Sequence, residues 1–406
     1  MKTSRERRLI EQIRRGWPVP DSDAVESSLQ LAERIMAAIA ANGSAIGFDH
    51  YMQMALYEPG LGYYSGGATR FGAAGDFVTA PLISPLFSRT LARQCADCLA
   101  ELDTPVILEL GAGSGDMAAD LLVELAALGR LPQRYLILEV SAALREQQSQ
   151  TLQRKAPQLV ERVEWLERLP ERPIEGVLLA NEIIDALPVQ RFRLRAGVPQ
   201  ELAVGQQEGR FVWVERPAPA ALRQAVEQIQ AELGAPLADG YTSEYCAQTG
   251  PWLISLAAVL KRGVMLFIDY GYPRSEYYHP QRDMGTLVCH YRHRAHDDPL
   301  ILPGLQDITA FVDFSATAQA GVSAGLDVLG FAPQAQFLLG AGLLDLVQEE
   351  EATAPAGSPA GLLLAQQVKT LTLPGEMGER FKVLAFGRDF EAPLRGFSLS
   401  DQRFRL

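Results

Sequence analysis

Between residues 105 and 180 the chain alternates short apolar runs with longer stretches in which apolar residues recur at helical spacing. The apolar runs predict four strands, and the longer stretches predict two helices. The predicted strands are 105–110, 135–139, 162–166 and 177–180, and the predicted helices are 116–128 and 141–155. Because strands that alternate with helices pair in parallel and are covered on both faces, this segment predicts a doubly wound α/β fold.

A different pattern follows Pro188, where polar and apolar residues alternate in short runs. The runs at 190–195, 201–204 and 210–215 predict a short antiparallel meander, and a helix of roughly 219–233 follows. We interpret this part as a subdomain inserted into the main fold on the substrate side.

The remaining segments place the ends of the fold. Helical spacing predicts a helix at 24–41, another near 249–261, and helices in much of 316–370. Short apolar runs predict strands at 264–269 and 381–386. The predicted parts are an N-terminal helical and lid region at 1–90, a first part of the core at 91–189, the inserted subdomain at 190–250, and a second part of the core at 251–406 with a loop and helical excursion at 271–370.

Composition is that of an ordinary globular protein. The chain has 406 residues, 48% of them hydrophobic and 21% charged, and no apolar run is long enough to span a bilayer, so a soluble protein is expected. A formal net charge of −12 argues against a nucleic-acid binder, because such proteins neutralise phosphates with Lys and Arg. A basic partner fits this charge better.

The cysteines and the N-terminus bear on the compartment. Four cysteines are too few for a disulfide framework and no secretory leader precedes them, so a reducing, cytoplasmic setting is expected. The first 15 residues are basic and resemble an organelle transit peptide, but Glu6 and Glu11 argue against one. We interpret this segment as an amphipathic helix.

The strongest chemical signal is the end of the first predicted strand. The sequence Glu-Leu-Gly-Ala-Gly-Ser-Gly at 109–115 leads directly into a helix. Glycine lets the chain turn sharply and approach a ligand, and the helix directs its free amides at that ligand. A dinucleotide-binding loop would have its third glycine at position 116, which is Asp116 here.

The glycines instead fall at Gly111, Gly113 and Gly115, after Glu109, and this spacing resembles that of the S-adenosylmethionine-dependent methyltransferases. Glu139 ends the next strand, where an acid can accept both hydroxyls of a cofactor ribose. The alternative is a glycine-rich turn that binds no ligand.

A second cluster of polar residues follows the fourth strand of the predicted sheet. Asn181, Glu182 and Asp185 stand at one strand tip, where two acids can hold a cationic group beside a cofactor. A guanidinium matches best, because its planar fork pairs with carboxylates in a bidentate manner. The alternative is that Asn181 or Asp185 only caps the next helix.

Other residues are candidates for the substrate side of the cleft. Tyr63, Tyr64, Asp76 and Phe77 lie among glycines, which suits a mobile lid over a ligand. Asp269 and Tyr270 follow the fifth strand and can line the same cleft, although Asp269 can equally satisfy loop amides.

Two groups of residues contain possible metal ligands, but their spacing is only weak evidence for a metal site. Cys95 and Cys98 lie in a predicted helix without a second pair, so we interpret them as core residues. His290, His293 and His296 with Asp297 and Asp298 could collect a metal, but a polar loop that closes over substrate is the preferred interpretation. No metal is predicted.

Several motifs together resemble those of one family, the MidA-type methyltransferases, whose mitochondrial members assist assembly of respiratory complex I. The matching segments are 57–64, 75–81, 83–86, 109–115, 180–188, 267–271, 285–287, 291–294, 296–298, 307–309, 312–314 and 377–383. They occur in order over most of the chain. Positions 183 and 184 are Ile-Ile, where aromatic residues are expected in many relatives.

The resemblance implies a seven-stranded methyltransferase sheet of Rossmann-like type with its last strand antiparallel, and S-adenosylmethionine as the methyl donor. For the mitochondrial members it implies symmetric dimethylation of a protein arginine, with a respiratory complex I subunit as a possible partner. The site residues it implies are Glu109, Gly111, Gly113, Gly115, Glu139 and Asn181 for the cofactor, with Asn181, Glu182 and Asp185 at the methyl-transfer site.

The leading hypothesis is therefore a protein-arginine N-methyltransferase. Two alternatives stay open, a methyltransferase of small molecules and a non-catalytic assembly factor that binds a partner protein. No oligomeric state is predicted.

Overall fold

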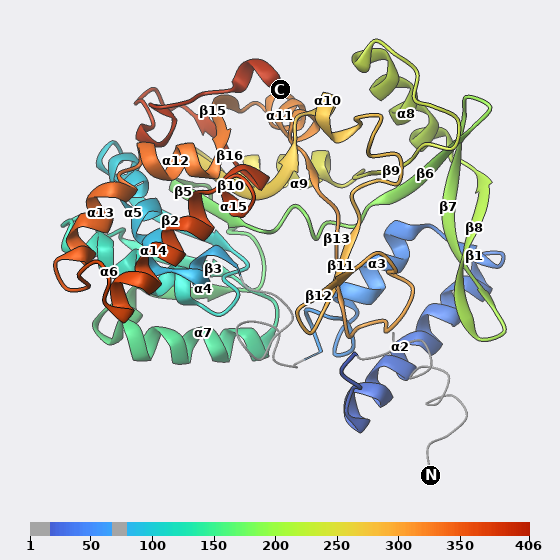
Figure 1. Ribbon diagram of the computed structural model, residues 1–406, viewed down its shortest axis with the longest axis horizontal. Helices are drawn as coiled ribbons and strands as arrows, with labels where there is room; N and C mark the ends of the chain where they lie inside the picture. The colour runs from blue at the N-terminus through green and yellow to red at the C-terminus, as the bar shows by residue number, and fades with distance from the viewer. Residues whose placement is uncertain (1–16, 67–78) are drawn as a thin grey trace. The chain divides into compact units, whose positions relative to one another are not determined.

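The computed structural model describes residues 17–66 and 79–406 (Figure 1). The predicted N-terminal amphipathic helix and the candidate residues Asp76 and Phe77 lie outside this part of the chain. The chain forms two compact units, each built from separate segments. The first unit comprises 1–77, 186–248 and 274–311, and the second comprises 78–185, 249–273 and 312–406. The segment 274–311, which the sequence assigns to the core, is thus grouped with the inserted subdomain.

The second unit contains the predicted α/β sheet. Its strands are β2 (Pro105–Leu110), β3 (Arg134–Leu138), β4 (Val163–Leu166), β5 (Ile174–Asn181), β10 (Leu260–Tyr272), β15 (Asp327–Pro333) and β16 (Phe381–Arg388). They are ordered β15-β16-β10-β5-β2-β3-β4, and the short strand β14 (Val312–Asp313) pairs with the end of β10. The five central and outer strands from β10 to β4 are parallel, whereas β16 is antiparallel to both of its neighbours. The predicted seven-stranded sheet with an antiparallel last strand is confirmed.

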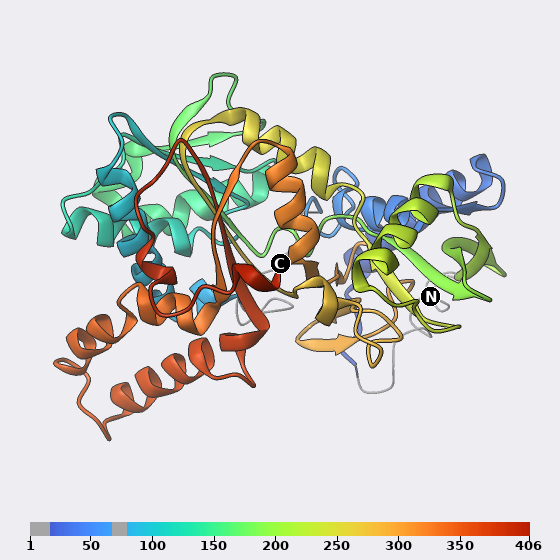
Figure 2. The ribbon, with the colours of Figure 1, turned by 90° about the horizontal axis from the view of Figure 1, so that it is seen from above.

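Helices cover both faces of this sheet (Figure 2). They are α4 (Ala80–Ile83), α5 (Pro85–Ala100), α6 (Asp116–Ala127), α7 (Ala142–Lys155), α9 (Thr249–Val259), α11 (Phe314–Ser323), α12 (Gln334–Gly340), α13 (Leu343–Glu351), α14 (Pro359–Thr372) and α15 (Met377–Arg380). Several begin at the side-chain caps that the sequence supplies, because a free helix amide needs an acceptor. Ser141 accepts the amide of Leu144 in α7, and Asp313 accepts that of Ala316 in α11.

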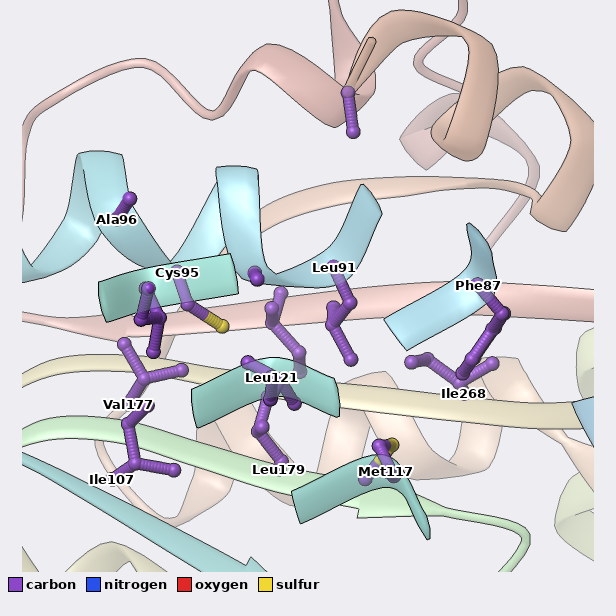
Figure 3. Packing of buried hydrophobic residues seen from close by; sticks show 14 of the residues in the cluster. Phe87, Leu91, Cys95, Ala96, Ile107, Met117, Leu121, Val177, Leu179 and Ile268 are labelled. Atoms are coloured by element: carbon purple, nitrogen blue, oxygen red, sulfur yellow. The ribbon is translucent and has the colours of Figure 1, made fainter. Parts of the chain in front are cut away.

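Alternate residues of each strand face opposite helix layers. On one face Ile107, Val177 and Leu179 pack beneath α5 and α6 in a continuous buried cluster (Figure 3). On the other face Phe267 contacts Trp252 of α9 and Phe386 of β16. Full burial of one such side chain is worth about 2 kcal/mol, so this two-sided core holds the strand ends in place. Cys95 and Cys98 belong to the same cluster, as expected of core residues.

One strand contradicts the sequence prediction. Helices were expected over much of 316–370, but β15 lies between α11 and α12 and forms the edge of the sheet beside β16. Its period-two pattern is interrupted at Gly330, where the ladder with β16 is irregular and a Cβ would meet the Phe397 ring at 2.4 Å. Pairing with β16 therefore decides the structure of this segment, not its own periodicity.

The first unit contains two antiparallel sheets. The strands of the larger sheet are β1 (Ala45–Ile46), β6 (Gln190–Arg195), β7 (Val198–Gln207), β8 (Arg210–Pro217) and β9 (Thr242–Tyr245), and the helices are α2 (Ser22–Ala41), α3 (Phe48–Tyr57), α8 (Ala220–Leu233) and α10 (Arg274–Tyr277). This confirms the predicted meander and the helix after it. The smaller sheet consists of β11 (Val288–Tyr291), β12 (Arg294–His296) and β13 (Asp307–Thr309) in the order β12-β11-β13. It occupies a stretch for which only a loop was predicted.

Among the described helices none combines the length and the apolar composition that crossing a membrane requires.

Candidate active site

The glycine loop joins β2 to α6 at the carboxyl end of the parallel sheet. Gly111, Gly113 and Gly115 all have positive φ angles, +60°, +53° and +84°, which residues with a side chain rarely adopt. Gly111 is exposed, and Gly115 is the N-cap residue of α6. The backbone of this loop is therefore bare at Gly111, whereas Gly115, at the start of α6, is buried.

Asp116, which stands where a dinucleotide fold would have glycine, has a structural role. Its carboxylate accepts a hydrogen bond from Ser114 Oγ at 2.8 Å and forms an ion pair with Lys155 Nζ at 3.1 Å. Lys155 also pairs with Asp120, so this lysine ties the end of α7 to the start of α6.

Glu109 lies beneath the loop and is only 1% exposed. It accepts a hydrogen bond of 2.6 Å from the Tyr135 hydroxyl on the neighbouring strand. Burial raises the pKa of Glu109 to about 7, the Tyr135 hydrogen bond lowers it, and the charge of Glu139 raises it further. Glu109 therefore supports the loop from inside the sheet, and the structure offers no exposed oxygen of this residue to a ligand.

Glu139 directly follows β3, the strand next to β2 and its glycine loop. One carboxylate oxygen accepts the backbone amide of Ser141 at 2.9 Å, and the other accepts Gln148 Nε2 at 3.2 Å. Burial raises the pKa of Glu139, and these two hydrogen bonds oppose the shift. The next residue, Val140, is 71% exposed, so an apolar side chain stands uncovered next to this acid.

Gln148 of α7 is a residue that the sequence did not single out. It is fully buried, and its amide nitrogen donates to the Gly113 carbonyl at 3.1 Å as well as to Glu139. Its amide oxygen accepts a hydrogen bond of 2.9 Å from Trp165 Nε1. A glutamine on a polar helix carries no motif, so only the packing of α7 against the loop reveals this link.

The tip of β5 carries the second predicted cluster. Asn181 donates to Glu182 Oε1 at 3.2 Å, and Glu182 has a positive φ of +53°. The buried oxygen of Asn181 has no hydrogen-bond partner among the residues that the structure describes. No described helix begins after this tip, since the next element is β6, so the interpretation of Asn181 or Asp185 as a helix cap is wrong.

Asp269 of β10 holds this tip from below. One of its oxygens accepts the backbone amides of Ile183, Ile184 and Asp185 at 2.9–3.2 Å, and the other accepts its neighbour's amide at 2.9 Å. Burial raises its pKa well above the usual range, and the charges of Asp185 and Glu182 add to that shift. Asp269 is 1% exposed, so it satisfies loop amides and does not line an open cleft.

Tyr270 points its ring at Phe381, with 5.4 Å between the ring centroids. Ile183 at the β5 tip lies against the glycine loop, because a Cβ on Gly111 would stand 2.6 Å from its Cδ1. The second unit thus brings together the glycine loop, Glu139 and the β5 tip with its two acids.

Of the predicted lid residues, Tyr63 and Tyr64 lie in the described part of the first unit, and both are packed against it. Tyr63 is fully buried, and Tyr64 donates its hydroxyl to Asp307 at 2.9 Å and stacks on Tyr57. The turn folds back onto α3, where Tyr63 and Tyr64 donate their amides to Ala55 and Leu56. Tyr63 and Tyr64 therefore belong to a packed turn and not to an exposed loop, which differs from the expectation for these two residues.

His293 has a different position from the one expected as well. It stands exposed at the turn between β11 and β12, where both Arg292 and His293 have positive φ. His296 accepts the amide of Asp298 at 3.3 Å and packs edge-on against Trp17. These histidines belong to a hairpin and not to a polar loop, and no described group of His, Cys, Asp and Glu is arranged to hold a metal ion.

The second unit fits the cofactor that the glycine spacing predicts. A nucleoside with a charged amino-acid tail needs bare backbone, a carboxylate for ribose hydroxyls and further polar acceptors. The loop at Gly111 has the first, Glu139 is placed where it could serve as the second, and the Asn181 oxygen, which has no partner among the described residues, could serve as the third. Val140 offers an apolar surface for a flat base.

Comparison with known proteins agrees with this geometry. A family model described as "Putative S-adenosyl-L-methionine-dependent methyltransferase" matches residues 90–332, more than half of the chain. The chain belongs to this family. The matched stretch contains the glycine loop, Glu139 and the β5 tip. The MidA-type resemblance is confirmed, and S-adenosylmethionine is the donor of the family.

Individual relatives extend the match beyond this stretch. The chain is 28% identical to the Drosophila melanogaster "Protein arginine methyltransferase NDUFAF7 homolog, mitochondrial", over 91% of this chain and 87% of the relative. It is 31% identical to the Mus musculus "Protein arginine methyltransferase NDUFAF7, mitochondrial", over 82% and 79%.

The crystal structure of "a COG1565 superfamily member and likely methyl transferase from Burkholderia thailandensis bound to S-adenosyl-homocysteine" is 45% identical to this chain, with a TM-score of 0.91 over 96% of this chain and 100% of the other. This protein thus shares the fold of the present chain over nearly its whole length.

Proposed function

We propose that this methyltransferase transfers methyl groups from S-adenosylmethionine to arginine side chains of a protein substrate. The observation that carries the proposal is the density of carboxylates at the β5 tip. Asp185 and Glu182 lie near enough to Asp269 for their charges to raise its pKa. A guanidinium relieves this repulsion, because it stays cationic and pairs with two carboxylates in fixed geometry.

In this proposal the donor binds at the glycine loop and the guanidinium binds at the β5 tip. Gly111, Gly113 and Gly115 hold the amino-acid part of the donor with Glu139 on its ribose, and Asn181 supplies an acceptor. When bound, the donor supplies an electrophilic methyl group on a sulfonium sulfur.

At the β5 tip Glu182 and Asp185 bind and orient the guanidinium. Their charge stabilises the cation while a nitrogen gains the methyl group and loses a proton, and a carboxylate oxygen is the acceptor for that proton. Asp269 keeps the backbone of the tip in place during this step.

The names of the relatives support arginine as the acceptor. The Drosophila and mouse proteins are both named protein arginine methyltransferases, and both are named mitochondrial. We propose that this protein also methylates arginine. A respiratory complex I subunit as its partner and a cytoplasmic location stay predictions. The net charge of −12 suits a basic, arginine-bearing partner.

Labelled donor identifies the acceptor directly. The protein is incubated with labelled S-adenosylmethionine and host lysate, and labelled residues are mapped by mass spectrometry. Methylarginine in a protein is expected, whereas label only in small molecules would show that the acceptor is of another class. An absence of label together with an absence of donor binding in calorimetry would contradict the methyltransferase activity itself.

Two variants test the role of the acids. Glu182→Gln keeps the size of the side chain but removes its charge, so kcat is expected to fall about 100-fold or more while donor affinity changes little. Glu227→Gln, on the exposed face of α8, is the matched control and should retain full activity. Equal activity of both variants would exclude Glu182 from catalysis, and wild-type protein that binds its partner but transfers no methyl group would favour an assembly factor.

A further inference from the structure

Gln148 occupies a position between the two halves of the donor site. Its side chain is fully buried in α7, and both hydrogen-bonding ends of the amide are engaged. The amide nitrogen reaches the Gly113 carbonyl at 3.1 Å and Glu139 Oε2 at 3.2 Å. No other hydrogen bond that the structure gives for the described residues joins the glycine loop to Glu139.

The orientation of this amide follows from chemistry. Trp165 Nε1 can only donate, and it lies 2.9 Å from Gln148 Oε1. The oxygen of Gln148 must therefore face the indole, which leaves the two N–H groups for Gly113 and Glu139. Both of these are acceptors, so each hydrogen bond of the amide has the right polarity.

Backbone packing fixes the position of the same residue. A Cβ on Gly115 would lie 2.9 Å from Gln148 Cα and 3.2 Å from its carbonyl oxygen. The absence of a side chain at Gly115 thus lets α7 approach the loop closely enough for the Gln148 amide to reach Gly113. The glycine that caps α6 and the glutamine of α7 form one packed unit.

We propose that Gln148 is a positioning residue that sets the distance and orientation between the glycine loop and Glu139, and that Trp165 reports on donor binding through it. The inference rests on the proposed binding of S-adenosylmethionine in this loop. A ligand that hydrogen-bonds to Glu139 changes the hydrogen bond between Gln148 and Glu139, and this change is passed to the Trp165 indole through the Gln148 amide. Gln148 touches no reacting atom, so its loss affects binding of the donor more than the methyl-transfer step.

Gln148→Glu is the sharpest test, because it keeps the shape and the acceptor for Trp165 but replaces the donor nitrogen with an oxygen. That oxygen would face the Gly113 carbonyl and the Glu139 carboxylate, and acceptors repel one another. The dissociation constant for S-adenosyl-homocysteine and the KM for the donor are each expected to rise at least tenfold, with kcat at saturation reduced less than threefold. Gln150→Glu, on the exposed face of the same helix, should leave both unchanged.

Tryptophan fluorescence separates a positioning role of Gln148 from a purely structural one, because a purely structural residue would not link ligand binding to the emission of Trp165. Trp165 is one of four tryptophans, so the change in emission on S-adenosyl-homocysteine binding is compared between the wild type and Trp165→Phe. The change is expected in the wild type, and is expected to be absent in Trp165→Phe and in Gln148→Glu at saturating ligand. Gln148→Met, which removes the hydrogen bonds without adding charge, replaces Gln148→Glu if that variant does not fold.

The outcomes separate this inference from the proposed function. Wild-type protein that binds no S-adenosyl-homocysteine in calorimetry would overturn the proposed function, and the inference with it. Wild-type binding combined with affinity of Gln148→Glu or Gln148→Met within twofold of the wild type would overturn the inference alone. So would an emission change that persists in Gln148→Glu at saturation.

Discussion

Two glycine-rich segments of this chain both suggest function, but they use glycine for different purposes. In the loop at 109–115 exposed Gly111 leaves the backbone bare, and a Cβ there would meet only the tip of the Ile183 side chain. In the turn at 58–66 a Cβ on Gly62 would stand 2.5 Å from the Glu58 amide and 2.7 Å from the Leu56 carbonyl. The first glycine makes room for a ligand, and the second makes room for the chain itself.

The surroundings of the two segments differ in the same way. Around the glycine loop, Glu109, Glu139 and Asp269 are buried carboxyl groups with raised pKa values. Around the turn, Tyr64 is bonded to Asp307 and Tyr63 is core. Buried carboxyl groups with perturbed pKa values beside bare backbone indicate a binding site, whereas packed aromatic rings indicate a structural role.

Replacing one glycine in each segment with alanine is expected to give the largest difference, because one change affects stability and the other affects donor binding. Gly62→Ala forces backbone atoms of α3 apart and should lower the unfolding free energy of the first unit by at least about 3 kcal/mol, with donor affinity retained. Gly111→Ala costs only about 1 kcal/mol, because its clash is with a flexible side-chain end and its φ is left-handed, but should weaken donor binding at least tenfold. Thermal unfolding and calorimetry measure the two effects, and the reverse pattern would refute the comparison.

The pH dependence of stability tests the charge beside the glycine loop. The pKa of Glu109 is about 7 in the folded protein and about 4.5 when exposed, so the folded state retains a proton that the unfolded chain has lost between these values. Its contribution to stability is complete below pH 4.5 and is lost as the pH rises through 7.

Glu109→Gln removes this dependence. The unfolding free energy of the variant relative to the wild type is expected to rise by about 3 kcal/mol from pH 4.5 to pH 8. Denaturant titrations at several pH values measure it, with Glu227→Gln as the control. A difference that stays constant across this range would show that the Glu109 carboxyl is not held in a low-dielectric site.

The smallest expected effect concerns the turn. Tyr64→Phe removes only the hydroxyl that donates to Asp307, and should lower the unfolding free energy by about 1 kcal/mol without changing donor affinity or kcat. Urea unfolding and steady-state kinetics measure both. A drop in kcat or a rise in KM would restore Tyr64 as a residue of the substrate side.

The amino-acid sequence by itself determined the alternating strands and helices of 105–180, the antiparallel meander and the glycine loop. These follow from local signals, since the period of apolar residues and the spacing of Gly111, Gly113 and Gly115 are visible without any contact. The position of Glu139 is predictable for the same reason, because an acid directly after a buried strand stands at the carboxyl edge of the sheet.

Only the tertiary structure decided the rest. β15 is a strand because it pairs with β16, and Tyr63 is core because Gly62 lets the turn close onto α3. Asp269 was placed by its position after a strand, but only the fold shows which of its two predicted roles it has, because the amides that it accepts are distant in the sequence. Gln148 has no local pattern, and its role comes from a carbonyl and a carboxylate that folding brings within 3.2 Å. Hydrogen bonds and close packing between remote segments depend on distances that sequence periodicity does not contain.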